Sequence, residues 1–85
     1  MTLYVLKGKN GKRYVGITNN LSRRLREHRK KVTKAGQILN DFSVLYTEKF
    51  TNHKTARVRE MFLKSGQGRK WLDALENESR PALGG

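Results

Sequence analysis

Cysteine is absent from this sequence of 85 residues, and proline occurs only once. Without cysteine, neither disulfide bonds nor thiolate zinc sites can form, and the two histidines, His28 and His53, do not have zinc-binding spacing. The apolar run at residues 3–6 is too short for a signal peptide or a membrane span. Because only 35% of the residues are hydrophobic, we expect one small cytoplasmic domain with a thin core, no membrane association and no disulfide partner.

Two common kinds of catalytic machinery are also missing. The sequence has no glycine-rich phosphate loop of the Walker type. It has no close pair of carboxylates for general acid–base catalysis. The remaining candidates for chemistry are the tyrosines Tyr4 and Tyr14, a basic segment with one histidine, and a lone carboxylate, Glu60.

Acidic side chains are scarce. Seven Asp and Glu face 19 Lys and Arg, which gives a net charge of +12. Self-repulsion of this size destabilises a compact domain, so an anionic partner is expected. Nucleic acid is the first candidate, with ribosomal RNA and membrane phospholipid as alternatives. Residues 22–34 hold seven Lys or Arg and one Glu, so the middle of the chain is expected to carry the binding surface.

Residues 2–8 and 12–18 are predicted to form a β-hairpin, because an Asn-Gly turn signal lies between two apolar runs. A two-residue loop would place Tyr4 and Tyr14 on opposite faces of the sheet. A three-residue loop with a left-handed glycine places them on the same face, with Leu6 facing Tyr14 and Tyr4 facing Gly16. We favour this second register because it gathers four apolar side chains on the other face: Leu3, Val5, Val15 and Ile17.

A basic helix is predicted over about residues 20–32, capped by Asn19 or Asn20. On one face of this helix, Arg24 and His28 are four residues apart and therefore lie side by side. A modest apolar stripe lies on another face and consists of Leu21, Leu25 and Val32.

The rest of the chain is predicted to contain a loop at 33–41, a third strand at 42–50 and a second helix at about 53–65, which begins after Thr51 or Asn52. The sequence SGQG is expected to end that helix. Its buried side is predicted to consist of Val58, Met61 and Phe62. A short last helix follows around Trp71, Leu72 and Leu75, within a domain that spans residues 1–77 before a flexible tail at 78–85.

Four short motifs in this order resemble the GIY-YIG nuclease superfamily. TLY at residues 2–4 and YVG at 14–16 are similar to the family's paired motifs, and LSRRLREH resembles its first helix. TARVREMFLKSGQGRKW is similar to the block that carries the family's metal-binding Glu. The likeness covers about residues 2–75 and is strongest to small standalone members related to the excision-repair nuclease subunit. The first motif begins with Thr2 instead of Gly, and the family's late Asn has no clear counterpart.

This resemblance implies an α+β domain, with a three-stranded antiparallel sheet packed with about three helices. It implies an endonuclease that hydrolyses DNA phosphodiester bonds with one divalent metal ion, Mg²⁺ or Mn²⁺. The implied catalytic residues are Tyr4, Tyr14, Arg24 and His28, and the implied metal ligand is Glu60. The DNA substrate is expected to be recognised by shape, such as a branch, a nick or a single strand. The expected nucleic-acid contacts are Gly16, Arg23, Arg26, Lys30, Lys64, Arg69 and Lys70.

Each of these residues also has a simpler interpretation. A tyrosine on a small hairpin is commonly a packing residue or a stacking platform. A helical wheel places Glu60 opposite Val58 and Phe62, where it would form a solvated ion pair with Arg57 or Lys64. A non-catalytic nucleic-acid-binding module on the same fold therefore stays open as the alternative function.

Overall fold

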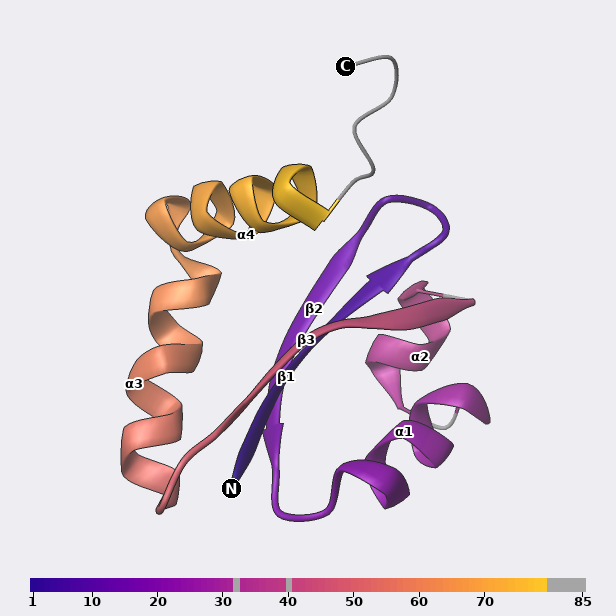
Figure 1. Cartoon of the computed structure of the whole chain (residues 1–85). Helices are drawn as coiled ribbons and strands as arrows, with labels where there is room; N and C mark the ends of the chain where they lie inside the picture. The colour runs from indigo at the N-terminus through magenta and orange to yellow at the C-terminus, as the bar shows by residue number, and fades with distance from the viewer. Residues whose placement is uncertain (32, 40, 80–85) are drawn as a thin grey trace.

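In a computed structural model of the chain, the structure describes residues 1–31, 33–39 and 41–79. These residues form β1 (Thr2–Gly8), β2 (Arg13–Thr18), α1 (Leu21–Arg29), α2 (Lys34–Leu39), β3 (Phe42–Lys49), α3 (His53–Lys64) and α4 (Gly66–Ser79). The strands make one antiparallel sheet in the order β2-β1-β3. Helices α1 and α2 lie on one side of the sheet, and α3 and α4 lie on the other (Figure 1). The predicted α+β architecture is confirmed.

The hairpin has the three-residue loop that the sequence favours. The Gly8 amide donates to the Lys12 carbonyl at 2.8 Å, and Gly11 has a left-handed φ of 87°. Tyr4 is consequently opposite Gly16, and Leu6 is opposite Tyr14. This register places the two tyrosines of the paired motifs on the same face of the sheet.

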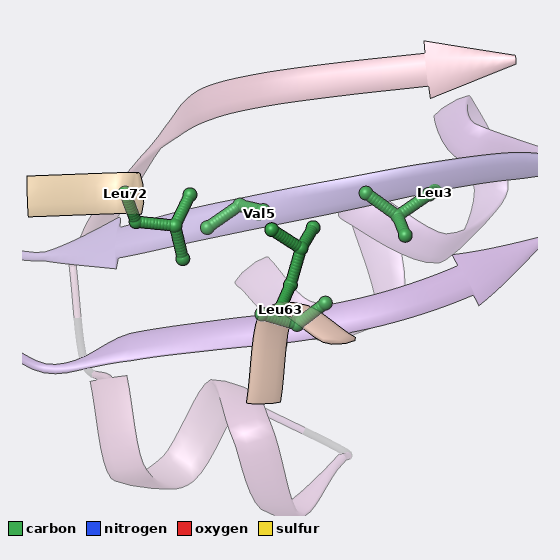
Figure 2. Packing of buried hydrophobic residues seen from close by; sticks show 5 residues of the cluster. Leu3, Val5, Leu63 and Leu72 are labelled. Atoms are coloured by element: carbon green, nitrogen blue, oxygen red, sulfur yellow. The ribbon is translucent and has the colours of Figure 1, made fainter. Parts of the chain in front are cut away.

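The other face of the sheet forms the main core. Leu3 and Val5 of β1 pack against Leu63 of α3 and Leu72 of α4 (Figure 2). Val15 belongs to the same cluster, and Ile17 packs against it. The four apolar side chains that the hairpin register gathers are therefore core residues, as predicted.

A second cluster lies on the face that carries the tyrosines. Tyr4, Leu6 and Leu39 are buried there, and Leu21 and Leu25 of α1 pack against them. Val32, the third residue of the predicted stripe, lies outside the described residues. Asn20 caps α1, since its side chain accepts from the Arg23 amide.

Helix α2 replaces the loop predicted at 33–41, so that prediction was wrong. The helix lies directly on the end of α1: a side chain at Gly36 would come within 2.1 Å of the His28 carbonyl oxygen. This close approach requires glycine, and it brings Leu39 into the second core cluster. The segment gives little sequence signal because α2 has only six residues and contains this glycine.

Helix α3 turns a different face inward from the predicted one. Val58 and Met61 are 66% and 63% exposed, whereas Ala56 and Leu63 are buried. Phe62 packs against the core as predicted. The inward face also holds Arg59 and Glu60. Arg59 tolerates this position because its guanidinium lies over the rings of Trp71 and Phe62, at 4.8 and 5.1 Å.

Helix α4 is longer than the predicted short helix and runs to Ser79, while residues 80–85 lie outside the described part of the chain. Ion pairs fasten it across the hairpin. The Arg13 guanidinium lies 2.9 Å from Asp73 and 2.8 Å from Glu76, and Lys7 lies 3.0 Å from Glu76. These contacts hold α4 beside the edge strand β2, where it forms one wall of the candidate active site.

Candidate active site

The two tyrosines lie together on one face of the hairpin. Their ring centroids are 6.1 Å apart. Gly16 lies beneath both rings: a Cβ there would be 2.7 Å from the Tyr4 ring and 2.9 Å from the Tyr14 ring. Gly16 thus provides the space in which the two phenols meet, and any larger residue would displace them.

His28 of α1 completes an aromatic cluster with these tyrosines. It is fully buried, with an exposed fraction of 0%. Its Nε2 atom lies 2.9 Å from the Tyr4 hydroxyl, and its ring centroid is 5.5 Å from that of Tyr14. Its Nδ1 atom lies 2.6 Å from the hydroxyl of Thr33.

Arg24 lies one helical turn before His28 and close to both phenols. Hydrogen bonding with Tyr4 is the largest contribution that raises the pKa of Arg24, followed by Glu27, whose carboxylate is 3.1 Å away. A smaller contribution from Tyr14 raises the pKa of Arg24 in the same direction. The guanidinium therefore stays charged close to the two phenols.

Burial determines the protonation of the inner groups. Burial raises the pKa of Tyr4 to about 12; hydrogen bonding from Arg24 opposes that shift, and a hydrogen bond with Tyr14 adds to it. Burial and then the Arg24 charge lower the pKa of His28 below its ordinary value of 6.5, against a smaller effect of Glu27. At neutral pH, Tyr4 is a neutral phenol and His28 a neutral imidazole.

Tyr14 differs from Tyr4 in its access to solvent. Tyr4 is 1% exposed, whereas Tyr14 is half-buried and lines a pocket of about 440 Å³ between the edge strand and the two C-terminal helices. Lys64 and Arg69 line the same pocket. A ligand in this pocket would meet Tyr14 and at least two cationic side chains.

Glu60 lies on the inward face of α3, with a side chain only 12% exposed. This disagrees with the helical wheel that placed it on the solvated side. Its Oε2 atom accepts from Lys64 Nζ at 3.1 Å, so it adjoins the pocket through Lys64. Within the described residues, no group of three His, Cys, Asp or Glu could hold a metal. A single carboxylate nevertheless suits Mg²⁺, a hard ion that keeps most of its waters.

The other predicted nucleic-acid contacts are surface cations on two helices. Arg23, Arg26 and Lys30 are exposed in or directly after α1, and Lys70 is exposed in α4. Together with Lys64 and Arg69 of the pocket, these four side chains place positive charge on both sides of the tyrosines. Gly16, in contrast, is buried beneath the two rings.

Two residues of this region were missed by the sequence analysis. Thr33 contacts His28 but was predicted to lie in a loop. Threonine is a common N-cap residue, and this preference is the sequence feature that could have indicated a helix beginning after Thr33. Arg59 was overlooked because a charged residue is normally placed on the outer face of a helix.

None of the helices in the described part of the chain has the length and apolar character needed to cross a membrane. Residues 1–72 match the GIY-YIG catalytic domain. The chain therefore belongs to the GIY-YIG family, with a nuclease-type fold that indicates endonuclease activity in general and a nucleic-acid substrate. Neither curated protein sequences nor solved structures yield a significant match.

Proposed function

We propose that this protein is a metal-dependent endonuclease that hydrolyses phosphodiester bonds in DNA. The observation that carries the proposal is the meeting of two phenols, a neutral imidazole and a guanidinium beside a cationic pocket. Attack on a phosphodiester requires an oriented water, neutralisation of the phosphate oxygens and assistance to the leaving oxygen. Groups in or beside this pocket can meet each requirement.

Tyr14 is the residue that contacts the attacking water. It lines the pocket, whereas the Tyr4 hydroxyl is enclosed and bonded to His28. The raised pKa of Tyr4 also keeps its hydroxyl protonated at neutral pH, so Tyr4 has no free site for a further proton. Tyr14 therefore orients the water and, once its own phenol proton has left to solvent, accepts the proton of that water, while Tyr4 positions Tyr14.

Arg24 neutralises charge at the same place. Its planar guanidinium can give parallel hydrogen bonds to two phosphate oxygens. Both tyrosines lie close enough to Arg24 to raise its pKa, so a phosphate bound to Arg24 would lie near the Tyr14 hydroxyl. This juxtaposition brings the attacking water and the reacting phosphorus together.

Glu60 is the residue that would hold Mg²⁺ or Mn²⁺, and the bound ion would assist the leaving oxygen as a Lewis acid. The carboxylate is shielded from bulk solvent, with a side chain only 12% exposed. Lys64 neutralises it in this structure and lines the pocket of Tyr14.

Affinity for DNA comes from phosphate contacts. A domain of this size has little surface for reading bases, so recognition depends on the shape of the substrate, such as a branch, a nick or a single strand. The side chains proposed to contact phosphates are Arg23, Arg26, Lys30, Lys64, Arg69 and Lys70.

Plasmid nicking tests this function. The purified protein should convert supercoiled DNA to the nicked form with Mg²⁺ or Mn²⁺, and EDTA should stop the reaction. Glu60→Ala should abolish cleavage while DNA binding stays unchanged or improves, because a negative charge is removed near the phosphates. The matched control is Glu78→Ala, which removes an exposed carboxylate from the end of α4 and should leave cleavage intact.

A non-catalytic nucleic-acid-binding module is the second candidate. The Lys64–Glu60 ion pair favours it, because a carboxylate already neutralised by an ammonium is less available to a metal. In that case the tyrosines and the basic helices would act as stacking platforms and phosphate clamps. Absence of nicking on linear, branched and single-stranded DNA with either ion, by a protein that binds these DNAs, would favour this module.

A further inference from the structure

The hydroxyl oxygen of Thr33 makes two hydrogen bonds, one with His28 of the aromatic cluster and one with the start of α2. Its hydroxyl lies 2.6 Å from His28 Nδ1, and the same oxygen accepts from the Gly36 amide at 3.0 Å. The second contact is an N-cap of α2, in which a threonine oxygen accepts from the third amide of the helix. The close packing of Gly36 on the His28 carbonyl holds the two contacts in place.

This double contact restricts where the hydroxyl proton of Thr33 can point. A hydroxyl has one proton to donate, and the Gly36 amide already occupies one of its lone pairs. Among the hydrogen bonds of the described residues, His28 Nδ1 is the only acceptor available to that proton. A neutral imidazole that accepts at Nδ1 carries its own proton at Nε2.

We propose that Thr33 is a positioning residue that fixes His28 as the Nε2–H tautomer. His28 then donates to the Tyr4 oxygen, 2.9 Å from Nε2. Tyr4 in turn keeps its proton free for Tyr14, whose ring centroid lies 6.1 Å from that of Tyr4. The donors therefore run in one direction, from Thr33 through His28 and Tyr4 to the Tyr14 oxygen.

The direction of this chain matters for catalysis, a consequence that rests on the function proposed above. Tyr14 can take the proton of water only as a phenolate, after its own proton has left to solvent. A hydrogen bond from Tyr4 and the positive charge of Arg24 would stabilise that phenolate before it accepts the proton. In the opposite tautomer, Tyr4 would donate to His28 and could not donate to Tyr14. Thr33 would thus act on the reaction through two other residues, without touching the substrate.

The tautomer can be measured without any cleavage. Long-range proton–nitrogen correlation spectra of the ¹⁵N-labelled protein report which ring nitrogen of a histidine carries the proton. His53, the other histidine of the chain, is exposed and serves as an internal reference. The wild-type spectrum should show His28 protonated at Nε2 alone, and protonation at Nδ1 alone would overturn the proposal.

Two substitutions sharpen this test. Thr33→Ser keeps the hydroxyl and should keep the Nε2–H tautomer. Thr33→Asp keeps an N-cap acceptor for Gly36 but has no proton to give at neutral pH, so it should place a proton on Nδ1. A folded Thr33→Asp protein whose His28 stays protonated at Nε2 alone would contradict the role of Thr33.

Cleavage provides a second readout. Thr33→Asp should lower kcat by about tenfold or more with little change in KM, whereas Thr33→Ser should cut like the wild type. If the wild type shows the Nε2–H tautomer but never cuts DNA, the proposed function fails and the assignment of Thr33 stands. If the wild type cuts DNA and carries the Nδ1–H tautomer, the assignment of Thr33 fails and the proposed function stands.

Discussion

The Tyr4 hydroxyl and His28 Nε2 are 2.9 Å apart and join the central strand β1 to helix α1 through a buried contact. The two residues are 24 positions apart in the chain, and both are less than 2% exposed. This contact therefore belongs to the core of the fold and to the candidate active site at the same time. Its buried imidazole makes the stability of the fold sensitive to pH.

Stability should fall when the pH drops below about 6.5, the ordinary pKa of histidine. The pKa of His28 is lower in the folded protein, mainly because of burial and then because of Arg24, so the unfolded chain binds a proton first. The unfolding free energy should then decrease by up to about 1.4 kcal/mol per pH unit between the two pKa values. Chemical denaturation at a series of pH values measures this slope.

The matched variants for that measurement are His28→Gln and His53→Gln. His28→Gln should lose the slope, since no imidazole is then buried beside Tyr4, Tyr14, Arg24 and Glu27. His53→Gln should keep it, because His53 is exposed. Parallel pH profiles for wild type and His28→Gln would show that carboxylates, and not this histidine, cause the change.

Gly16→Ala should destabilise the protein and disturb the site. The added methyl group would lie 2.7 Å from the Tyr4 ring, so the phenols must move apart. We expect a loss of about 1–3 kcal/mol in unfolding free energy, as for other overpacked cores. Gly66→Ala is the control, because a Cβ there meets nothing within 4 Å. Equal stability of the two variants would contradict the packing of the rings over Gly16.

Glu76→Gln should loosen helix α4 from the hairpin. Glu76 lies 2.8 Å from Arg13 and 3.0 Å from Lys7, and all three side chains are partly buried. Losing this charge should lower the unfolding free energy by about 1–2 kcal/mol. Glu78→Gln makes the same change at an exposed position of the same helix and should cost less than about 0.5 kcal/mol. Thermal unfolding of both variants decides the point.

DNA binding should weaken steeply as salt increases. Each phosphate contact contributes a slope of about 0.7 to 0.9 in log affinity against log salt concentration. Arg26→Ala should therefore lower the affinity for all sequences and reduce the slope by about one. Lys49→Ala removes the same charge from β3, away from the proposed surface, and should leave the slope unchanged. Fluorescence anisotropy at several salt concentrations tests this.

Local chemistry made the hairpin predictable from the sequence. The Asn-Gly signal restricts the loop, and a one-residue change of register would move every side chain to the other face. Only one register separates four apolar residues from the two tyrosines. The meeting of Tyr4, Tyr14 and Gly16 was therefore predictable before any coordinates were known.

The inward face of α3 could not be predicted in the same way. Val58 and Met61 are apolar but exposed, while Arg59 and Glu60 turn inward. The reason is tertiary: Trp71 and Phe62 provide aromatic faces for Arg59, and Glu48 provides a counter-ion 3.6 Å away. Helix α2 was missed for a similar reason, because it depends on the close packing of Gly36 against the His28 carbonyl at the end of α1, which is a contact between two helices.

The rate of DNA cleavage by Tyr14→Phe tests the central claim most directly. Under single-turnover conditions with Mg²⁺ or Mn²⁺, removal of this hydroxyl should slow cleavage by about 100-fold or more, while DNA affinity changes by less than about twofold. Tyr46→Phe removes a hydroxyl from β3 that donates to Glu48, and it should cut at nearly the wild-type rate. A Tyr14→Phe protein that cuts as fast as the wild type would contradict the account.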